Sequence, residues 1–319
     1  MEKPDRNLAM ELVRATEAAA IRAFPYIGKG DKNASDGAAV DAMRLFLGTV
    51  NFEGLVVIGE GEKDDAPMLF NGEIVGNGYG PKVDIAVDPI DGTSLTAAGR
   101  MNAISVIAAS DRGSMLDVSS VYKMDKLVTG ALGVGVCDIR MSIKENLIEY
   151  SKSSRKPLDE LLVAVLDREY NQDLIEQIRS AGAATRLLRD GDVAGGIQAA
   201  RSESRIDICA GIGGSPEGIV TACGVRALGG HIQGILAPRE DFEIERGTNA
   251  GLLFNHVYEM DDMVNSENTF FVATGVTDGP LVSGVRKRGG IIHTESIVIR
   301  GKSGTVRKVF AEYQADRWI

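Results

Sequence analysis

The 319-residue sequence predicts an α/β protein, built as one large unit or as two closely packed subdomains. The second half of the chain alternates strand and helix patterns with short connections, as in α/β sheets. Hydrophobic residues make up 44% of the chain and charged residues 25%, the balance of an ordinary globular protein. The chain is long enough to bury a large core, and no internal repeat or low-complexity linker divides it.

The chain opens with two predicted helices. Apolar residues recur at helical spacing over 5–27, with Asp5 as the expected cap, and a second helix is expected over 36–47. The loop between them, 28–33, is polar and contains glycines. Its residues are therefore candidates for ligand contact.

Two predicted strands end in acidic residues. A buried strand over 55–58 leads to the carboxylate cluster of 60–65. Apolar and polar residues alternate over 82–88, which indicates a half-buried strand. Pro89 is expected to end this second strand, because proline has no N–H to donate to a ladder.

The turn after the second strand can aim several oxygen atoms at one point. Asp88 and Asp91 stand three residues apart, and Gly92 exposes its backbone next to the Thr93 hydroxyl. Oxygen ligands of this kind favour Mg²⁺ or Mn²⁺ over Zn²⁺. An isolated Asp-Gly would more simply be a surface turn, but the whole hexapeptide 88–93 behind a strand favours a divalent-metal site.

The remaining elements lead to a division of the chain. Strands are expected over 103–109 and 126–130, a helix over 142–150, and then alternating strands and helices over 161–166, 171–180, 185–188, 192–200, 206–210 and 216–227, with later strands near 269–273 and 291–299. The polar and basic segment 151–157 is the nearest feature to a boundary. We expect an N-terminal α+β subdomain, 1–155, with most of the candidate metal ligands. A C-terminal α/β subdomain, 156–319, would carry substrate contacts and the last ligand, with the site between the two.

Composition excludes several classes of partner. The formal net charge of −10 argues against nucleic acid or an anionic membrane, because phosphate backbones are held by clustered Lys and Arg. No run approaches the ~20 apolar residues of a membrane span, and the charged N-terminus does not resemble a signal peptide. Cys137, Cys209 and Cys223 lack metal-type spacing and are expected to be buried reduced thiols. A cytoplasmic location is the corresponding expectation.

The glycine-rich segment 211–218 adds a further acidic candidate, Glu217. Ser215 is expected to cap a helix whose first residue is Pro216, so Glu217 could simply be a favourable charge in the first turn. The glycines before the helix expose N–H groups suited to an anion. A carboxylate beside an anion site is unfavourable unless a cation bridges them, so metal plus phosphate explains both features. The histidines, His231, His256 and His293, are scattered, and no Ser or Cys beside a His suggests a nucleophile.

The hexapeptide 88–93 resembles the signature of the lithium-sensitive, metal-dependent sugar phosphatases, which include inositol monophosphatases and fructose bisphosphatases. Taken in order, the segments 28–36, 58–62, 88–93, 190–194, 211–218 and 300–305 are similar to those of the bacterial class II fructose-1,6-bisphosphatases. Inositol monophosphatases carry a Trp-Asp motif before a late helix, whereas the sole tryptophan here is Trp318. The resemblance to the class II family covers nearly the whole chain.

This resemblance implies a layered α/β/α/β/α sandwich of the inositol monophosphatase-like type, with a dimer or tetramer as the assembly. The implied activity is hydrolysis of the 1-phosphate of fructose 1,6-bisphosphate in gluconeogenesis by water, with two or more Mg²⁺ or Mn²⁺ ions and sedoheptulose 1,7-bisphosphate as a possible second substrate. The implied metal ligands are Asp36 and Glu60 for one ion and Asp88, Asp91 and Glu217 for the other. The implied catalytic residues are Thr93, Lys32 and Asp88. The implied substrate contacts are Asp91, Gly92, Thr93, Tyr122, Arg168, Tyr170, Asp190, Gly191, Asp192 and Gly214.

The chain departs from the family pattern in two places. The family usually shows a basic residue, proline, arginine and histidine where this chain has 168–171, Arg-Glu-Tyr-Asn. A lost arginine contact to a distal phosphate would cost about 1.5–3 kcal/mol, unless Arg186, Arg189 or a neighbouring subunit's arginine replaces it. The segment that begins at Tyr122 is one residue longer than usual.

Three alternatives follow from the same residues. Asp190 and Asp192 could cap a helix instead of binding sugar hydroxyls. The substrate could be an inositol phosphate or another small phosphate ester. The glycine runs 76–80 and 211–214 could belong to a non-catalytic nucleotide-binding module, although neither fits the dinucleotide fingerprint.

Overall fold

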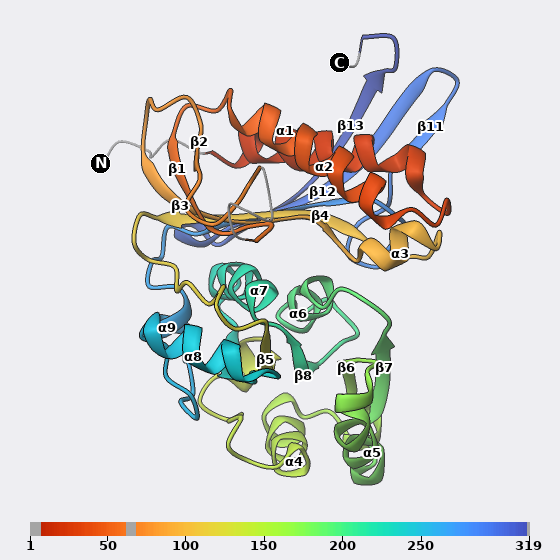
Figure 1. Cartoon of the computed structure of the whole chain (residues 1–319). Helices are drawn as coiled ribbons and strands as arrows, with labels where there is room; N and C mark the ends of the chain where they lie inside the picture. Colours follow the sequence, from red (N-terminus) through yellow and green to blue (C-terminus); the bar gives the residue numbers. More distant parts are fainter. Residues whose placement is uncertain (1–7, 62–67, 318–319) are drawn as a thin grey trace, which may run out of the picture.

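The computed structural model describes residues 8–61 and 68–317, which form two β-sheets and the helices that cover them (Figure 1). The helices are α1 (Ala9–Ala23), α2 (Lys32–Leu47), α3 (Thr93–Ala97), α4 (Ile143–Ser154), α5 (Gln172–Ala181), α6 (Val193–Ala199), α7 (Ser215–Ala227), α8 (Asp241–Asn249) and α9 (Met260–Met263). The strands are β1 (Glu53–Ile58), β2 (Ile74–Val75), β3 (Lys82–Asp91), β4 (Ile104–Asp111), β5 (Lys123–Thr129), β6 (Leu162–Leu166), β7 (Ala184–Leu188), β8 (Ile208–Gly214), β9 (His231–Leu236), β10 (Phe270–Gly275), β11 (Arg286–Arg288), β12 (Ile291–Arg300) and β13 (Thr305–Gln314).

These elements form five layers (Figure 1). Helices α1 and α2 cover the outer face of the larger sheet, and α6 and α7 lie between the two sheets. Helices α4 and α5 cover the far face of the smaller sheet. The predicted α/β/α/β/α sandwich is therefore confirmed.

The two sheets differ in the relative direction of their strands. Within the described residues the larger sheet has the order β11-β12-β10-β4-β3-β1-β2, with β13 paired to β12, and only β1 and β3 run parallel. The smaller sheet has the order β7-β6-β8-β5-β9. Its strands β7, β6 and β8 run parallel, whereas β5 is antiparallel to both of its neighbours. The parallel strands are those of the alternating series predicted from the sequence.

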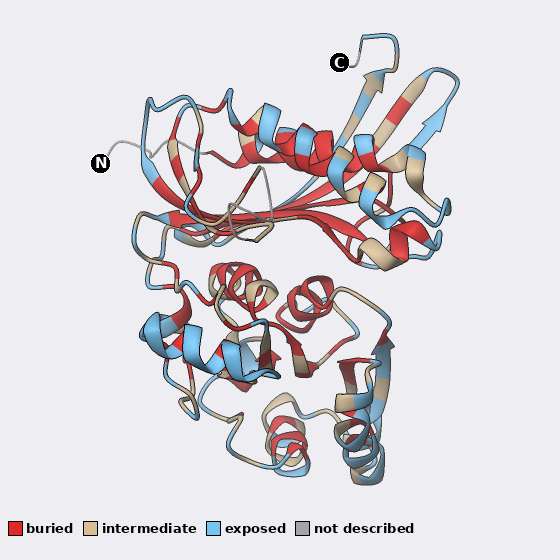
Figure 2. Cartoon of the chain, in the orientation of Figure 1, coloured by how far each residue is buried: buried red, intermediate tan, exposed pale blue. Residues whose placement is uncertain are grey.

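Three apolar cores hold the five layers together, and the middle one covers both faces of the α6 and α7 layer. Under α1 and α2 the core contains Leu12, Met43 and Phe52. Between the sheets it contains Ile197 of α6, Val220 of α7 and Phe271 of β10. Beneath α4 and α5 it contains Leu147, Val163 and Ile175. Figure 2 shows the consequence, with α6 and α7 buried and α8 largely exposed.

Helix α2 begins at Lys32, about one turn before the predicted start at Asp36. The reason is Asp31, whose side chain accepts a hydrogen bond from the Ala34 N–H at 2.9 Å and caps the helix. Asp36 therefore lies inside the helix. The first helix begins at Ala9, and its predicted cap, Asp5, lies outside the described residues, as do residues 62–65 of the predicted carboxylate cluster.

Strand β3 continues through Pro89 to Asp91, so the prediction that Pro89 ends the ladder is wrong. Asp88 pairs with Val106 and Asp91 with Ile104, which leaves an extra residue on the β3 side. Pro89 lies in this β-bulge, where a missing N–H breaks no ladder hydrogen bond. Elements after residue 230 were largely missed, including β9, α8 and the long strand β13.

The boundary expected between 155 and 156 does not coincide with the division between the sheets. Strand β5, from the first half, lies in the smaller sheet, and strands β10 to β13, from the second half, complete the larger one. Strand β10 pairs directly with β4. The chain thus builds half of the larger sheet, then the smaller sheet, and finally returns to complete the larger one.

The described part of the chain contains no helix that is both long and apolar enough to cross a membrane. The three cysteines are free and buried, as predicted. The glycine run 76–80 serves packing, because side chains at Gly76 and Gly80 would collide with the Phe52 and Asn51 carbonyl groups. It does not line the cavity described next.

Candidate active site

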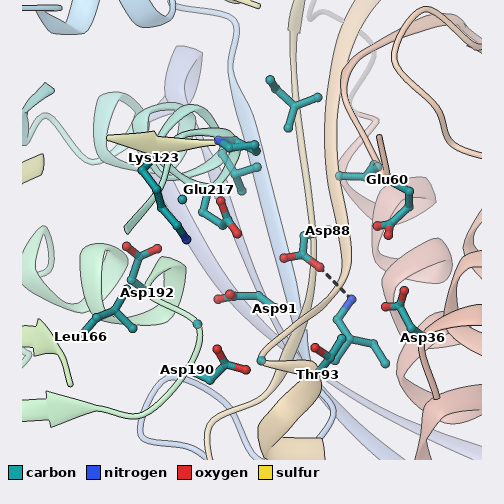
Figure 3. Close-up of a pocket in the computed structure, with 18 of the residues that line it drawn as sticks. Asp36, Glu60, Asp88, Asp91, Thr93, Lys123, Leu166, Asp190, Asp192 and Glu217 are labelled. Atoms are coloured by element: carbon teal, nitrogen blue, oxygen red, sulfur yellow. Dashed lines mark hydrogen bonds between the residues drawn. The ribbon is translucent and has the colours of Figure 1, made fainter. Parts of the chain in front are cut away.

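A cavity of ≈ 400 Å³ lies where the ends of β1 and β3 meet α2, α7 and the loop before α6 (Figure 3). The predicted site residues that line it are Asp36, Glu60, Asp88, Asp91, Gly92, Thr93, Arg168, Tyr170, Asp190, Gly191, Asp192, Gly214 and Glu217. They come from both sheets and from both halves of the chain. None of the three histidines, all within the described residues, lines this cavity.

Two predicted site residues, Lys32 and Tyr122, do not line the cavity. Lys32 lies at the start of α2, and its Nζ donates a hydrogen bond to Ser94 Oγ at 2.7 Å, one residue from Thr93. Tyr122 is half exposed, and its ring packs edge-on against Phe242 with centroids 6.1 Å apart. Both therefore lie beside the site.

The bulge in β3 positions the two central carboxylates. Asp88 and Asp91 lie on either side of it, and the Ile90 N–H donates to Asp88 Oδ1 at 3.0 Å, the dashed line in Figure 3. Gly92 then adopts a φ of 97°, a conformation that suits glycine, and helix α3 begins at Thr93. The bulge and this glycine turn the chain so that Asp88, Asp91 and Thr93 all line one cavity.

Gly191 allows the loop before α6 to approach β3. Its φ is 66°, and a Cβ at this position would lie 2.7 Å from Asp91 Oδ1. A larger residue would therefore push the Asp91 carboxylate away or lift the loop. On the other side of the cavity, a Cβ on Gly214 would collide with the Glu217 carboxylate.

Asp190 links the segment after β6 to the first turn of α3 across the cavity, and it does not cap α6, the helix that follows it in the chain. Its Oδ1 accepts a hydrogen bond from Arg168 Nη2 at 2.8 Å, and its Oδ2 accepts from the Ser94 N–H at 3.1 Å. Ser94 belongs to α3, next to Thr93. Asp190 thus fixes the start of α3 relative to the smaller sheet.

Asp192 precedes α6, but its side chain makes no capping hydrogen bond. Instead its Oδ2 lies 2.6 Å from Nζ of Lys126, a buried lysine of β5 that also donates to the Gly214 carbonyl at 2.8 Å. No motif in the sequence points to Lys126, or to Lys123, which lines the cavity. The available signal was a lysine placed between Met124 and Val128 at every second position, the side of the strand that an alternating pattern buries.

The site concentrates negative charge in a buried place. Burial raises the pKa of Asp88 and of Asp91 well above the usual range, and neighbouring carboxylates raise both further. Burial, followed by the charges of Asp36 and Glu217, raises the pKa of Glu60 to about 8. The pKa values of Asp36 and Glu217 are also raised, chiefly by burial.

Oxygen ligands and excess negative charge suit a divalent cation. Asp91 Oδ2 and Glu217 Oε2 are buried and have no hydrogen-bond partner in the structure, as expected of oxygen atoms that await a ligand. However, among the described residues no three Asp, Glu, His or Cys side chains already surround one point as in a metal site. The residues fit a metal chemically, while their side chains would have to move to ligate it.

Comparison with known proteins identifies the family. A family model described as bacterial fructose-1,6-bisphosphatase, glpX-encoded, matches residues 6–313. The chain is 42% identical over 325 aligned residues to the class 2 fructose-1,6-bisphosphatase of Haemophilus influenzae, covering 98% of this chain and 97% of that protein. It is equally similar to fructose-1,6-bisphosphatase 1 class 2 of Escherichia coli K12, of which 96% is covered. The resemblance seen in the sequence is thereby confirmed, and the chain belongs to the family of bacterial, glpX-encoded fructose-1,6-bisphosphatases.

Proposed function

We propose that this cavity hydrolyses the 1-phosphate of fructose 1,6-bisphosphate, yielding fructose 6-phosphate and inorganic phosphate, as a step of gluconeogenesis. The main observation behind this proposal is the β3 bulge, which places Asp88, Asp91 and Thr93 in one cavity with Glu217 of α7. Family membership supports the same reaction. Sedoheptulose 1,7-bisphosphate is proposed as a second substrate.

The carboxylates would hold two or more divalent ions, Mg²⁺ or Mn²⁺. Asp36 and Glu60 are proposed for one ion and Asp88, Asp91 and Glu217 for the other. When bound, the ions would supply positive charge for the phosphoryl group and lower the pKa of water. The buried unpartnered oxygens of Asp91 and Glu217 support this assignment.

The protein's own groups would orient the reactants. The Thr93 hydroxyl, at the first residue of α3, orients the attacking water. Asp88 Oδ1 is engaged by the Ile90 N–H, so Oδ2 is available to hold the proton of that water. Lys32, held against Ser94, offsets phosphate charge from beside the cavity. No phosphorylated enzyme group is required.

On the sugar side, Asp190 and Asp192 would accept hydrogen bonds from hydroxyl groups, since each carboxylate retains free lone pairs. Gly191 and Gly214 leave room for the substrate to approach the backbone. The assembly is proposed to be a dimer or tetramer located in the cytoplasm.

Arg239 is our candidate for the arginine missing near 168–171. Its guanidinium carbon lies 4.6 Å from the ring centre of Tyr170, which lines the cavity. The buried Glu243 carboxylate accepts hydrogen bonds from the backbone N–H groups of Tyr122 and Arg239, at 2.7 Å each. Glu243 therefore holds these two residues close to each other beside the cavity. We propose that Arg239, Tyr170 and Tyr122 bind the distal phosphate of the substrate.

Arg239→Ala should raise KM for fructose 1,6-bisphosphate roughly tenfold, the value of one charge-assisted contact. The effect should be small for fructose 1-phosphate, which lacks the distal group. Steady-state phosphate release with both substrates measures the difference, with Arg140→Ala as a control for removal of an exposed arginine. Equal KM values for wild type and Arg239→Ala would show that another group binds the distal phosphate.

The reaction itself is tested by phosphate release from fructose 1,6-bisphosphate with Mg²⁺ or Mn²⁺, with and without a chelator. Asp88→Asn should lower kcat at least a hundredfold, on the order expected for loss of a catalytic base. Asp138→Asn, outside the cavity, is the matched control. Chelator-resistant activity, or an Asp88→Asn enzyme as fast as wild type, would contradict the proposal. A parallel panel with sedoheptulose 1,7-bisphosphate and inositol 1-phosphate measures specificity.

A further inference from the structure

Lys123, the first residue of β5, lines the candidate active-site cavity, and none of the roles proposed for the cavity uses it. The family resemblance implies a substrate contact by Tyr122, at the start of a segment that is one residue longer than usual. The Tyr122 ring lies outside the cavity against Phe242, and the next residue, Lys123, lines the cavity instead. The wall that was expected to present a tyrosine therefore presents an ammonium group.

The cavity leaves the charge of Lys123 unused. Within the described residues, seven carboxylates and two cationic side chains, Lys123 and Arg168, line the cavity. Arg168 is committed, because its Nη2 lies 2.8 Å from Asp190 Oδ1. The Lys123 amino group has no ion pair or hydrogen bond in this part of the chain, whereas Lys126 of the same strand lies 2.6 Å from Asp192 Oδ2. The Lys123 ammonium is therefore available to an anionic ligand.

Lys123 approaches the cavity from the smaller sheet. Figure 3 shows its side chain entering from the side that carries Asp192 and Glu217, with Asp36 and Glu60 on the opposite side. The phosphate that reacts belongs among the proposed metal ligands at the end of β3. Lys123 is thus placed for a part of the substrate that projects toward the smaller sheet.

The backbone of Lys123 is connected to that of Arg239, the candidate for the missing arginine. The Lys123 carbonyl oxygen accepts a hydrogen bond from the Ala237 N–H at 2.8 Å, two residues before Arg239. The Tyr122 N–H, next to Lys123, donates to the same Glu243 carboxylate that accepts from the Arg239 N–H. Lys123 and Arg239 are therefore held on the same side of the cavity.

A second phosphate on the substrate needs a cation on this side. The proposed divalent ions serve the reacting phosphate, and a dianion close to carboxylates without a cation is repelled. Tyr170 lines the cavity where the family usually shows an arginine, and it offers a neutral hydroxyl. Lysine is a compact charge on a flexible stem, so it can follow a phosphate without the fixed fork of arginine. Lys123 can supply the charge that position 170 lacks.

We propose that Lys123 is a specificity-determining residue, which binds the distal phosphate together with Arg239 and so selects sugar bisphosphates over monophosphates. This inference rests on the proposed function, because the distal phosphate belongs to the substrate of that reaction. The ammonium group donates hydrogen bonds to the phosphate oxygens. Its removal weakens binding of ligands that carry the distal phosphate and leaves the groups at the 1-phosphate in place.

Lys123→Met should raise KM for fructose 1,6-bisphosphate roughly tenfold, the value of one charge-assisted contact, with little change in kcat. For fructose 1-phosphate, which lacks the distal group, both constants should stay near those of wild type. Lys123→Arg keeps the positive charge and should restore most of the affinity. Steady-state phosphate release measures all three, with Lys144→Met, which removes an exposed lysine of α4, as the matched control.

Product binding gives a second measurement that needs no turnover. Fructose 6-phosphate carries only the distal phosphate. Calorimetric titration with Mg²⁺ present should therefore show roughly tenfold weaker binding to Lys123→Met than to wild type or Lys144→Met. Equal affinity for the product in all three proteins would overturn the proposal.

Two kinetic results would also overturn it. A rise in KM that is equal for both substrates would mean that Lys123 serves the reacting phosphate or the metal ligands. A fall in kcat shared by Lys123→Met and Lys123→Arg would indicate a structural role for the side chain.

Failure of the proposed function is seen in the wild type. A wild type that releases no phosphate from fructose 1,6-bisphosphate contradicts the function and, with it, this inference. An active wild type whose Lys123→Met variant does not distinguish the two substrates contradicts the inference alone.

Discussion

Lys126 brings one positive charge into a region crowded with carboxylates. Only 5% of its side chain is exposed, and it joins Asp192 to the Gly214 carbonyl, two groups on different edges of the cavity. Burial alone would lower the pKa of this lysine, but Asp192 and Glu217 raise it, so that the amino group stays charged. We therefore propose that Lys126 positions Asp192 and Gly214, two of the residues proposed to contact the substrate.

Lys126→Met should lower the free energy of unfolding by about 3–5 kcal/mol, because it leaves Asp192 buried without its partner. It should also raise KM more than it lowers kcat. Urea unfolding and steady-state kinetics measure the two effects. Lys156→Met is the matched control, since Lys156 pairs with Asp207 at the same 2.6 Å but is 29% exposed.

Two further results bear on the role of Lys126. Asp192→Asn in the Lys126→Met background should cost less than the sum of the single changes, since the pair is then removed together. A Lys126→Met enzyme with wild-type KM would mean that Asp192 and Gly214 hold their places without it.

At the residue scale, the sequence predicts what is local. Asp88, Asp91, Gly92 and Thr93 are neighbours in the chain, so one strand and one turn suffice to bring them together. Lys126 is different, because its partners are far along the chain and its role exists only once β5 pairs with β8. The carboxylates of the site could be identified from sequence motifs, whereas Lys126, the lysine that pairs with one of them, could not.

Helix α1 places a buried acid against the larger sheet. Glu17 is 2% exposed and accepts hydrogen bonds from Thr294 of β12 at 2.7 Å and from Tyr313 of β13 at 2.5 Å. Burial raises the pKa of Glu17 above its ordinary 4.5, while the Tyr313 and Thr294 hydroxyls and the Arg14 charge oppose the rise. The element is therefore tied to the last two long strands by one carboxyl group.

Glu17→Gln should become relatively more stable than wild type as pH rises from 4 to 7. A pKa raised in the folded state contributes stability below the unfolded value, and that contribution is lost as pH rises through the folded value. The glutamine has no charge to bury, so it escapes this loss. Urea unfolding at several pH values measures the difference, with exposed Glu11→Gln as control. A difference independent of pH would contradict the raised pKa.

Elements were predictable where the pattern was regular. The alternating series after 160 was found because most of its strands and helices are short apolar segments separated by turn residues. Strand β3 was misjudged at its end, because a bulge that tolerates Pro89 depends on pairing with β4. Strand β13 is mostly exposed and mixes apolar residues with charged ones, so its sequence does not stand out as a strand.

At the scale of the whole molecule, the metal-free protein buries several carboxylates, whose ionisation in the folded state is unfavourable. The pKa values of Asp88, Asp91 and Glu60 are raised, that of Glu60 to about 8. Groups with a raised folded pKa lose their contribution as pH rises, so stability should fall between about pH 4 and pH 8. Cations that replace the protons should reverse this fall.

With a chelator present, Tm should decrease from pH 6 to pH 9, and added Mg²⁺ or Mn²⁺ should raise Tm more at pH 9 than at pH 6. Scanning calorimetry measures both slopes. Glu60→Gln should flatten the chelated slope, whereas Glu267→Gln, an exposed acid paired with Arg226, should not. If Tm in the presence of the chelator did not change with pH, the raised pKa values of these carboxylates would be contradicted.

The overall architecture was predictable from resemblance but not from local pattern. Nothing in the sequence around 270–314 indicates that these strands belong beside β4 and not beside β9. That choice depends on long-range packing, here of Phe270 and Phe271 on opposite faces of one sheet. The expected division at 155/156 was placed from the pattern along the sequence, whereas the two sheets are defined by pairing between strands that are far apart in the chain.

Because β4 pairs with β10, one edge of β4 stays unpaired during synthesis until β10 has been made. The ribosome completes β4 before it makes the entire smaller sheet, and β10 follows on the order of ten seconds or more later. During that interval the apolar, almost uncharged edge of β4, Ile104 to Ala109, has no partner strand, which is the condition for aggregation. We expect nascent chains that stall in this window to depend on chaperones, while the smaller sheet, whose strands are contiguous in the chain, folds without waiting.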